Sequence, residues 1–104
     1  MIEQLVEQIE ARFAELERQM SDPEVIGDRE RYAEVGREYR ELEPARRLAA
    51  EWRTLRDDLE GARELLAEGE DEELRRVVEE APARLERLEE EIRLAMVERD
   101  PNDA

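Results

Sequence analysis

The sequence contains no cysteine, no histidine and no lysine, and only four of its 104 residues are aromatic. The absence of cysteine excludes disulfides and thiol chemistry, and without cysteine or histidine the usual zinc sites are excluded too. No apolar run approaches the roughly 18 residues that a membrane-spanning helix needs. The first residues alternate apolar and acidic side chains, unlike a signal peptide. A cytoplasmic location is therefore expected.

Charged residues are abundant in the sequence, which has 32 acidic and 17 basic residues. All of the basic residues are arginine, and the net charge is -15. Abundant Glu, Arg, Leu and Ala are typical of long helices or coiled coils. The acidic balance disfavours broad nucleic-acid binding, because phosphates would be repelled, although a local arginine patch can still contact RNA. The exclusive use of arginine fits a codon bias better than selection for bidentate recognition of phosphate or carboxylate.

Apolar residues recur every three or four positions in three stretches, and each stretch predicts an amphipathic helix. The first helix is expected over about residues 2–20, with the stripe Ile2, Leu5, Ile9, Phe13, Leu16 and Met20. The second is expected over about 28–68, with Tyr32, Val35, Tyr39, Leu42, Ala49, Trp52, Leu55, Leu59, Ala62 and Leu66. The third is expected over about 72–97, with Leu74, Val78, Ala81, Leu85, Leu88, Ile92 and Ala95.

Two prolines fall inside these helical patterns. Pro44 lies within the second stripe, where a proline costs roughly 3 kcal/mol because it removes a hydrogen bond and clashes one turn back. Either a new helix begins at Pro44 or one long helix is kinked there, and the unbroken phase of the stripe favours the kinked helix. Pro82 lies inside the third stripe and should kink or break that helix.

The three stripes predict an all-α fold, an elongated antiparallel three-helix bundle or helical coiled-coil hairpin with a long kinked central helix. One helical domain is expected over residues 1–99. The polar residues 100–104, which include a proline, are expected to begin a linker. The pattern is compatible with a monomer and with self-association of the isolated chain.

The stretch MSDPEVIGDRERY, residues 20–32, predicts the corner between the first two helices. Ser21 with Glu24 has the spacing of a capping box, while Asp22 before Pro23 offers an alternative N-cap. The apolar pair Val25 and Ile26 is expected to hold the corner against the bundle. Gly27 is expected to break the turn, and the hypothesis that it has a positive φ predicts that Gly27→Val lowers the melting temperature. Asp28 is the expected N-cap of the long helix.

The stretch EGEDEEL, residues 68–74, predicts the second corner. Gly69 suits a helix C-cap and Asp71 suits the N-cap of the third helix. The acidic run here lacks the ligand spacing of a calcium-binding EF-hand loop. Four Glu-to-Arg pairs at i, i+4 are expected to support the helices, namely Glu43/Arg47, Glu72/Arg76, Glu80/Arg84 and Glu89/Arg93.

No catalytic, cofactor-binding or metal-binding residue is identified in this sequence. Ser21 and Thr54 carry the only hydroxyl groups outside tyrosine, and no histidine is present to activate either of them. The glycines are scattered and form no phosphate-binding loop. The chain is therefore not expected to be an enzyme by itself.

Arginines provide the candidate contact surface for a protein or RNA partner, with a salt-bridged solvent face as the more conservative interpretation. One set lies along the second helix and comprises Arg37, Arg40, Arg46, Arg47, Arg53 and Arg56. The other lies along the third and comprises Arg75, Arg76, Arg84 and Arg87. Trp52 is in phase with the apolar stripe, so it is interpreted as a core residue before an interface anchor. Which residues bind a partner is not determined by the pattern.

The stretch SDPEVIGDRERYAEVGREYRELEP, Ser21 to Pro44, resembles the first domain of bacterial class I peptide chain release factors, of the release factor 1 type that reads UAA and UAG. The stretch LLAEGEDEELRRVVEEA, Leu65 to Ala81, resembles the next acidic corner of that family. Residues 100–104, DPNDA, resemble the point where the first domain leads into the codon-reading and catalytic domains. The sister factor that reads UGA has a similar first domain, and only the amino-acid sequence of the first corner distinguishes the two factors in this resemblance.

The resemblance implies a ribosome-docking and factor-interaction domain in translation termination. The expected partners are the ribosome near its stalk base and the recycling GTPase release factor. The Gly-Gly-Gln motif for peptidyl-tRNA hydrolysis and the codon-reading tripeptide of the family have no counterpart in these residues. The resemblance implies that both would follow residue 104. The alternative is a free-standing acidic coiled-coil adaptor or oligomerisation module.

Overall fold

Four α-helices make up the part of the chain that the computed structural model describes, residues 1–99. They are α1 (Ile2–Met20), α2 (Pro23–Ile26), α3 (Arg29–Glu68) and α4 (Glu72–Glu98). No strand occurs within residues 1–99. The predicted all-α class with a long central helix is confirmed. The expected linker at 100–104 lies outside the described residues, so the proposed division at residue 99 stays a prediction.

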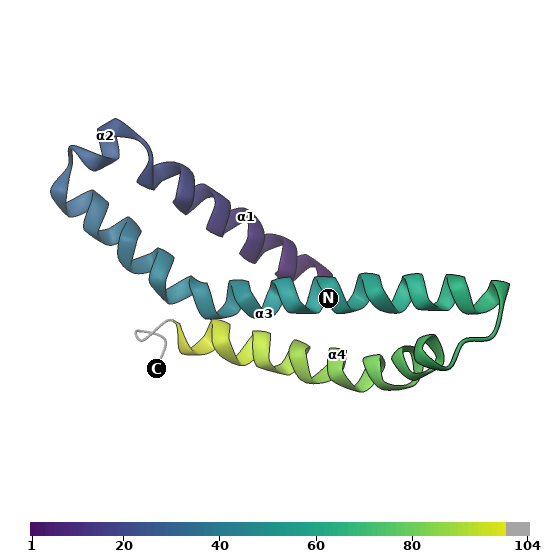
Figure 1. The fold of residues 1–104 in the computed structure, drawn as a ribbon. Coiled ribbons are helices and arrows are strands. Elements are labelled where there is room, and N and C mark those ends of the chain that lie inside the picture. Colours follow the sequence, from purple (N-terminus) through teal and green to yellow (C-terminus); the bar gives the residue numbers. More distant parts are fainter. Residues whose placement is uncertain (100–104) are drawn as a thin grey trace.

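The helix α3 is the spine of the molecule, and the other helices pack along different parts of it (Figure 1). With 40 residues, α3 is about 60 Å long, and the whole molecule measures 58 × 33 × 19 Å. Figure 1 shows α1 beside the half of α3 that follows the first corner, and α4 returning beside the other half. The protein is therefore two antiparallel helix pairs that share α3, a detail that the stripes alone do not predict.

The helix α3 continues through Pro44 without a break, and Figure 1 shows it changing direction partway along its length. This confirms the kinked single helix over the alternative of a new helix at Pro44. The helix α4 likewise continues through Pro82, so of the two outcomes expected at Pro82, a kink or a break, the break is wrong. Both prolines lie on exposed faces, where solvent can satisfy the carbonyl groups that they leave without a partner.

The corner between α1 and α3 is built by two aspartate caps. Asp22 accepts a hydrogen bond from the Glu24 amide at 2.9 Å, with Pro23 at the first helical position of α2. Ser21 is instead the C-cap of α1, so the Ser21 capping box is wrong and the Asp22 alternative is correct. Asp28 caps α3 by accepting from the Arg31 amide at 3.2 Å.

Two expectations about this corner are wrong. Gly27 has φ -73°, an ordinary helical value, so the hypothesis of a positive φ fails. The strain argument for Gly27→Val fails with it. A Cβ at Gly27 would lie 3.3 Å from the Pro23 carbonyl oxygen, which is tight without being prohibitive. Val25 is fully buried, but Ile26 is 53% exposed and does not hold the corner against the bundle.

The core follows the predicted stripes closely. A continuous cluster joins α1 residues such as Ile9 and Leu16 to Leu42 and Trp52 of α3 and to Leu88 and Ile92 of α4. Burying such side chains contributes roughly 1.5–3 kcal/mol each relative to leaving them exposed. Val6 is also fully buried although it lies outside the predicted stripe, and Tyr32 is 39% exposed although it lies within one.

The N-cap of α4 provides a direct test of local stabilisation. Asp71 accepts hydrogen bonds from the amides of Glu73 and Leu74 at 2.9 and 3.2 Å. We expect Asp71→Ala to lower the free energy of unfolding by about 1 kcal/mol because two amides lose their acceptor. Urea denaturation followed by circular dichroism measures this change. Asp71→Asn keeps an acceptor oxygen and should lose less than half as much; an equal loss in both variants would contradict the capping role.

Candidate interaction surface

Three arginines join the helices through ion pairs between residues far apart in sequence. The Arg12 guanidinium donates two hydrogen bonds to Glu38 at 2.6 and 2.7 Å, linking α1 to α3. Arg53 donates two to Glu10 at 2.8 and 2.7 Å, linking the same helices. Arg84 of α4 donates one to Glu51 of α3 at 2.9 Å. Paired guanidinium–carboxylate bonds of this kind fix orientation as well as adding energy.

Aromatic rings engage two further arginines. The guanidinium carbon of Arg46 lies 5.1 Å from the centre of the Phe13 ring, and Phe13 stacks on Tyr39 with centroids 4.5 Å apart. The guanidinium carbon of Arg56 lies 5.1 Å from the Trp52 ring centre. Both distances are within the range of a cation–π contact.

Trp52 itself is 3% exposed, which confirms its interpretation as a core residue. Its indole Nε1–H faces Glu89 Oε2 on α4 at 3.4 Å. The ring therefore lies where α3 and α4 meet, and its apolar body is buried while its single donor has an acceptor.

In the structure, some arginines of the two sets expected from the sequence form ion pairs, and others are exposed with none recorded among the described residues. Those engaged in ion pairs are Arg47, Arg53, Arg56, Arg75 and Arg84. Within residues 1–99, no ion pair or cation–π contact is recorded for Arg37, Arg40, Arg76 or Arg87, and all four are exposed. Of these two sets, the arginines left available to a partner are therefore Arg37 and Arg40 on the first half of α3 and Arg76 and Arg87 on α4.

Among residues 1–99, three carboxylates have lowered pKa values because arginine stabilises their charged form. The hydrogen bond from Arg18 is the largest cause of the fall of the Glu15 pKa to about 2, with a second hydrogen bond from Gln19. Arg12 lowers the pKa of Glu38 mainly through its hydrogen bonds, and Arg75 does the same for Glu70. These groups remain ionised at neutral pH, so they act as fixed charges.

The Arg12–Glu38 pair should make a measurable, pH-dependent contribution to stability. The side chains are 45% and 30% exposed, so we expect a coupling energy of about 0.5–1 kcal/mol near neutral pH. The pKa of Glu38 is lower in the folded protein than its ordinary 4.5. The coupling is therefore fully present above the pKa that Glu38 has in the unfolded chain, and it is lost as the pH falls through the lower pKa that Glu38 has in the folded protein.

A double-mutant cycle of Arg12→Gln and Glu38→Gln, measured by urea unfolding near pH 7 and again near pH 2, isolates this coupling from all other titrations. The cycle is needed because protonation of the other carboxylates also relieves repulsion across a chain of net charge -15. A coupling energy that is the same at both pH values would contradict the assignment.

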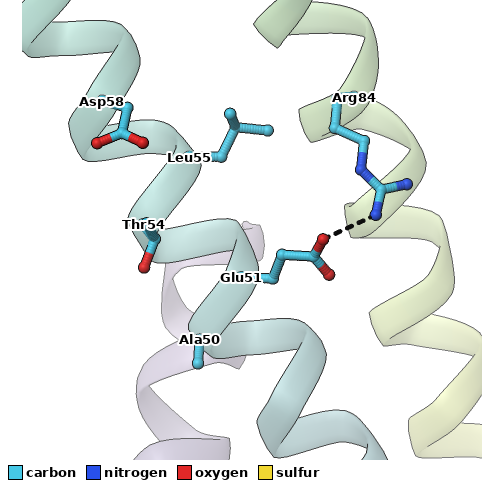
Figure 2. A pocket seen from close by; sticks show the side chains of 6 residues that line it. All are labelled: Ala50, Glu51, Thr54, Leu55, Asp58 and Arg84. Carbon is cyan, nitrogen blue, oxygen red and sulfur yellow. Dashed lines mark hydrogen bonds and ion pairs between the residues drawn. The ribbon is translucent and has the colours of Figure 1, made fainter.

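Two adjoining hollows mark the side of α3 between Pro44 and Asp58. One has a volume of about 430 Å³ and is lined by Pro44, Arg47, Leu48 and Glu51. The other has a volume of about 420 Å³ and is lined by Ala50, Glu51, Thr54, Leu55, Asp58 and Arg84. Figure 2 shows the second hollow, with the Glu51–Arg84 ion pair crossing from α3 to α4. Sequence reasoning missed this groove, because it depends on how α4 lies beside α3.

The described residues offer little for chemistry. No charged side chain within residues 1–99 is buried, so none is held in the apolar surroundings that raise a carboxyl pKa. Ser21 Oγ lies 3.4 Å from the Glu17 carbonyl oxygen, and Thr54 lies at the groove. Across the same residues, no acidic cluster is arranged to hold a metal ion, and no helix is long and apolar enough to span a membrane.

Comparison with known proteins gives the family. The PCRF domain family matches residues 9–104. The chain is 37% identical to peptide chain release factor 1 of Geobacter sulfurreducens, over 94% of this chain and 28% of that protein. It is 37% identical to the factor of Acidobacterium capsulatum, over 99% and 29%, and 32% identical to that of Lactobacillus delbrueckii subsp. bulgaricus, over 94% and 28%.

The chain therefore spans less than a third of the length of these relatives. No solved structure matches it. The match covers both corners, both arginine sets and the groove, and the resemblance drawn from the stretch Ser21 to Pro44 is confirmed. This chain belongs to the PCRF domain family.

Proposed function

We propose that this chain is the N-terminal domain of a class I peptide chain release factor and that it acts in translation termination by docking on the ribosome. The observation that carries the proposal is the family match over residues 9–104, together with relatives named peptide chain release factor 1. The same match favours this role over a free-standing acidic adaptor. The role would place the chain in the cytoplasm.

The form of the molecule suits docking better than catalysis. Interhelical ion pairs and a continuous core hold α1, α3 and α4 together as an elongated body. No histidine or cysteine is present, and no buried carboxylate within residues 1–99 could serve as a general acid or base. We therefore propose that peptidyl-tRNA hydrolysis resides in another part of the full-length factor. The ribosome near its stalk base and the recycling GTPase release factor are the proposed partners.

The test uses the purified chain with bacterial ribosomes that carry a stop codon in the decoding site and labelled formyl-methionyl-tRNA. We expect the chain to sediment with ribosomes and to compete with intact release factor 1, while releasing no formyl-methionine. Absence of sedimentation and competition would contradict docking. Release of formyl-methionine by the chain alone would contradict the separation of docking from hydrolysis.

Charge reversals then identify the docking face. Arg37→Glu with Arg40→Glu changes the first half of α3, and Arg76→Glu with Arg87→Glu changes α4 by the same net charge. These four arginines have no ion pair recorded within residues 1–99, so the reversals leave the recorded interhelical pairs in place. If one face docks, one pair of reversals reduces co-sedimentation and the other does not. Equal loss would indicate general repulsion from RNA.

A further inference from the structure

The end of the α3–α4 hairpin, residues 57–81, carries more than half of the net charge of the protein. This segment, the distal hairpin, contains eleven acidic and three basic residues, which gives it a net charge of -8 out of the total of -15. Residues 29–56 of α3, by contrast, contain eight basic and six acidic residues. Because like charges on adjacent helices repel one another, electrostatics opposes helix pairing most strongly in the distal hairpin.

Among the residues that the structure describes, the core cluster stops short of the distal hairpin. Its outermost buried members on α3 and α4 are Trp52 and Leu88. Three further residues are buried beyond them, namely Leu59, Ala62 and Ala81. The remaining leucines and valines of the distal hairpin are half-buried or exposed. Since alanine buries much less apolar surface than leucine, little hydrophobic free energy holds this segment closed.

The contacts that join the helices elsewhere are also missing from the distal hairpin. The ion pairs and aromatic contacts between α1 and α3 lie at residues 38–53 of α3. Figure 1 shows that the end of α3 before the second corner lies beside α4 alone. The ion pair Glu51–Arg84 joins α3 to α4 before the distal hairpin begins. Of the ion pairs recorded within residues 1–99, none joins the α3 part of the distal hairpin to its α4 part.

Gly61 weakens α3 inside the distal hairpin. Glycine is the least favourable residue after proline in a helix interior. A Cβ at Gly61 would meet none of the described atoms within 4 Å, so close packing does not require glycine at this position. The helix is therefore less stable here than an alanine would make it, although nothing in the packing demands that loss.

We propose that the distal hairpin opens while the rest of the fold stays intact, and that cations close it. In the open form, the end of α3 separates from the start of α4 and the core cluster remains packed. Opening moves the carboxylates of the two helices apart, so the closed form has the higher density of negative charge. Cations therefore accumulate more around the closed form and shift the equilibrium toward it. This behaviour does not depend on a role in termination.

Amide hydrogen exchange, followed residue by residue by nuclear magnetic resonance, measures the opening of each region separately. After correction for the rates of an unstructured peptide, amides of the distal hairpin should exchange at least about tenfold faster than amides of residues 45–52. Raising NaCl from about 0.01 to 0.1 M shortens the Debye length from about 30 to 10 Å and should slow exchange in the distal hairpin about threefold. Equal rates in the two regions, or no effect of salt, would overturn the proposal.

A core substitution outside the distal hairpin tests whether the two regions open separately. Ile9 of α1 is buried in the core cluster, and Ile9→Val should speed exchange of the core amides about fivefold because it deletes a buried methylene. The distal amides should keep their rate, because the contacts of Ile9 are the same in the open and closed forms. Gly61→Ala should instead slow the distal amides about fivefold. If Ile9→Val speeds both regions equally, the molecule opens as one unit and the proposal is wrong.

Matched charge variants test the electrostatic cause. Glu60→Gln with Glu64→Gln removes two exposed carboxylates from the distal hairpin, while Glu86→Gln with Glu90→Gln removes two from the part of α4 beside the core. Each pair is spaced i, i+4, so each change relieves the same repulsion within a helix. The first variant should slow the distal amides about threefold, and the second should leave their rate within about 1.5-fold. Equal slowing by both variants contradicts the proposal. Circular dichroism verifies that each variant is folded.

Discussion

Replacing Leu88 by alanine is expected to lower the free energy of unfolding by about 2–5 kcal/mol. Leu88 is fully buried in the core cluster that joins α4 to α3. Its removal leaves a cavity that the two helices cannot close without separating from the neighbouring core. A domain of this size has a total stability of roughly 5–15 kcal/mol, so the variant should unfold at a much lower urea concentration.

Leu94→Ala is the matched control for this experiment. The same substitution is made in the same helix, but Leu94 is 57% exposed, and the change should be within about 0.5 kcal/mol. Fluorescence of Trp52, the single tryptophan, reports the separation of α4 because its indole faces Glu89 on that helix. A Leu88→Ala loss no larger than that of Leu94→Ala would show that α4 does not share the core.

The contrast between Leu88 and Leu94 also shows why periodicity predicts so much of this fold. In a helix, the neighbours of a side chain lie three and four positions away in the sequence, so the residues of a buried face recur at that spacing and can be recognised from it. Leu88 lies in the stripe and is buried, while Leu94 lies outside it and is exposed. Val6 escaped assignment because the stripe of α1 is wider than one residue per turn. Tyr32 lies in the stripe of α3 but is 39% exposed, because it stands in the first turn of that helix and periodicity alone does not show whether another helix covers a given turn.

Caps were also predictable, because a cap depends on a few adjacent residues. Asp28 and Asp71 were expected as N-caps, and each accepts the amide hydrogen bonds of its helix. The choice between Ser21 and Asp22 needed the structure, because both residues have a suitable side chain one position apart. The prediction of a positive φ at Gly27 is wrong because a glycine before a new helix suggests a special φ, whereas here it completes an ordinary helical turn.

The candidate surface was much less predictable than the core. Of the four expected i, i+4 pairs, Glu43–Arg47 and Glu89–Arg93 are within ion-pair distance, at 3.7 and 3.9 Å. Arg84 instead pairs with Glu51 on α3, since a partner on a facing helix competes with one on the same helix. The choice between such partners depends on helix rotation and crossing, which local patterns do not contain. For the same reason, the groove between α3 and α4 had no sequence signal.

Pro44→Ala is expected to raise the free energy of unfolding by about 1–2 kcal/mol, although it removes the cause of the bend in α3. Proline inside a helix costs roughly 3 kcal/mol relative to alanine. Alanine restores the amide that can bond to the Arg40 carbonyl, and because Pro44 is exposed the change deletes no buried contact. Two effects reduce the gain: the unfolded chain becomes more flexible without proline, and a straighter α3 fits its partner helices less closely.

Urea unfolding gives the size and the sign of this effect, and hydrogen exchange at residues 40–48 tests whether the restored hydrogen bond forms. Pro82→Ala in α4 is the matched comparison, because Pro82 is also exposed inside an unbroken helix. A lower stability for Pro44→Ala, with an increase for Pro82→Ala, would contradict the expectation. That result would mean that the bend at Pro44 is required for α1 and α4 to pack on the same spine, and that its loss costs more packing energy than the hydrogen bond returns.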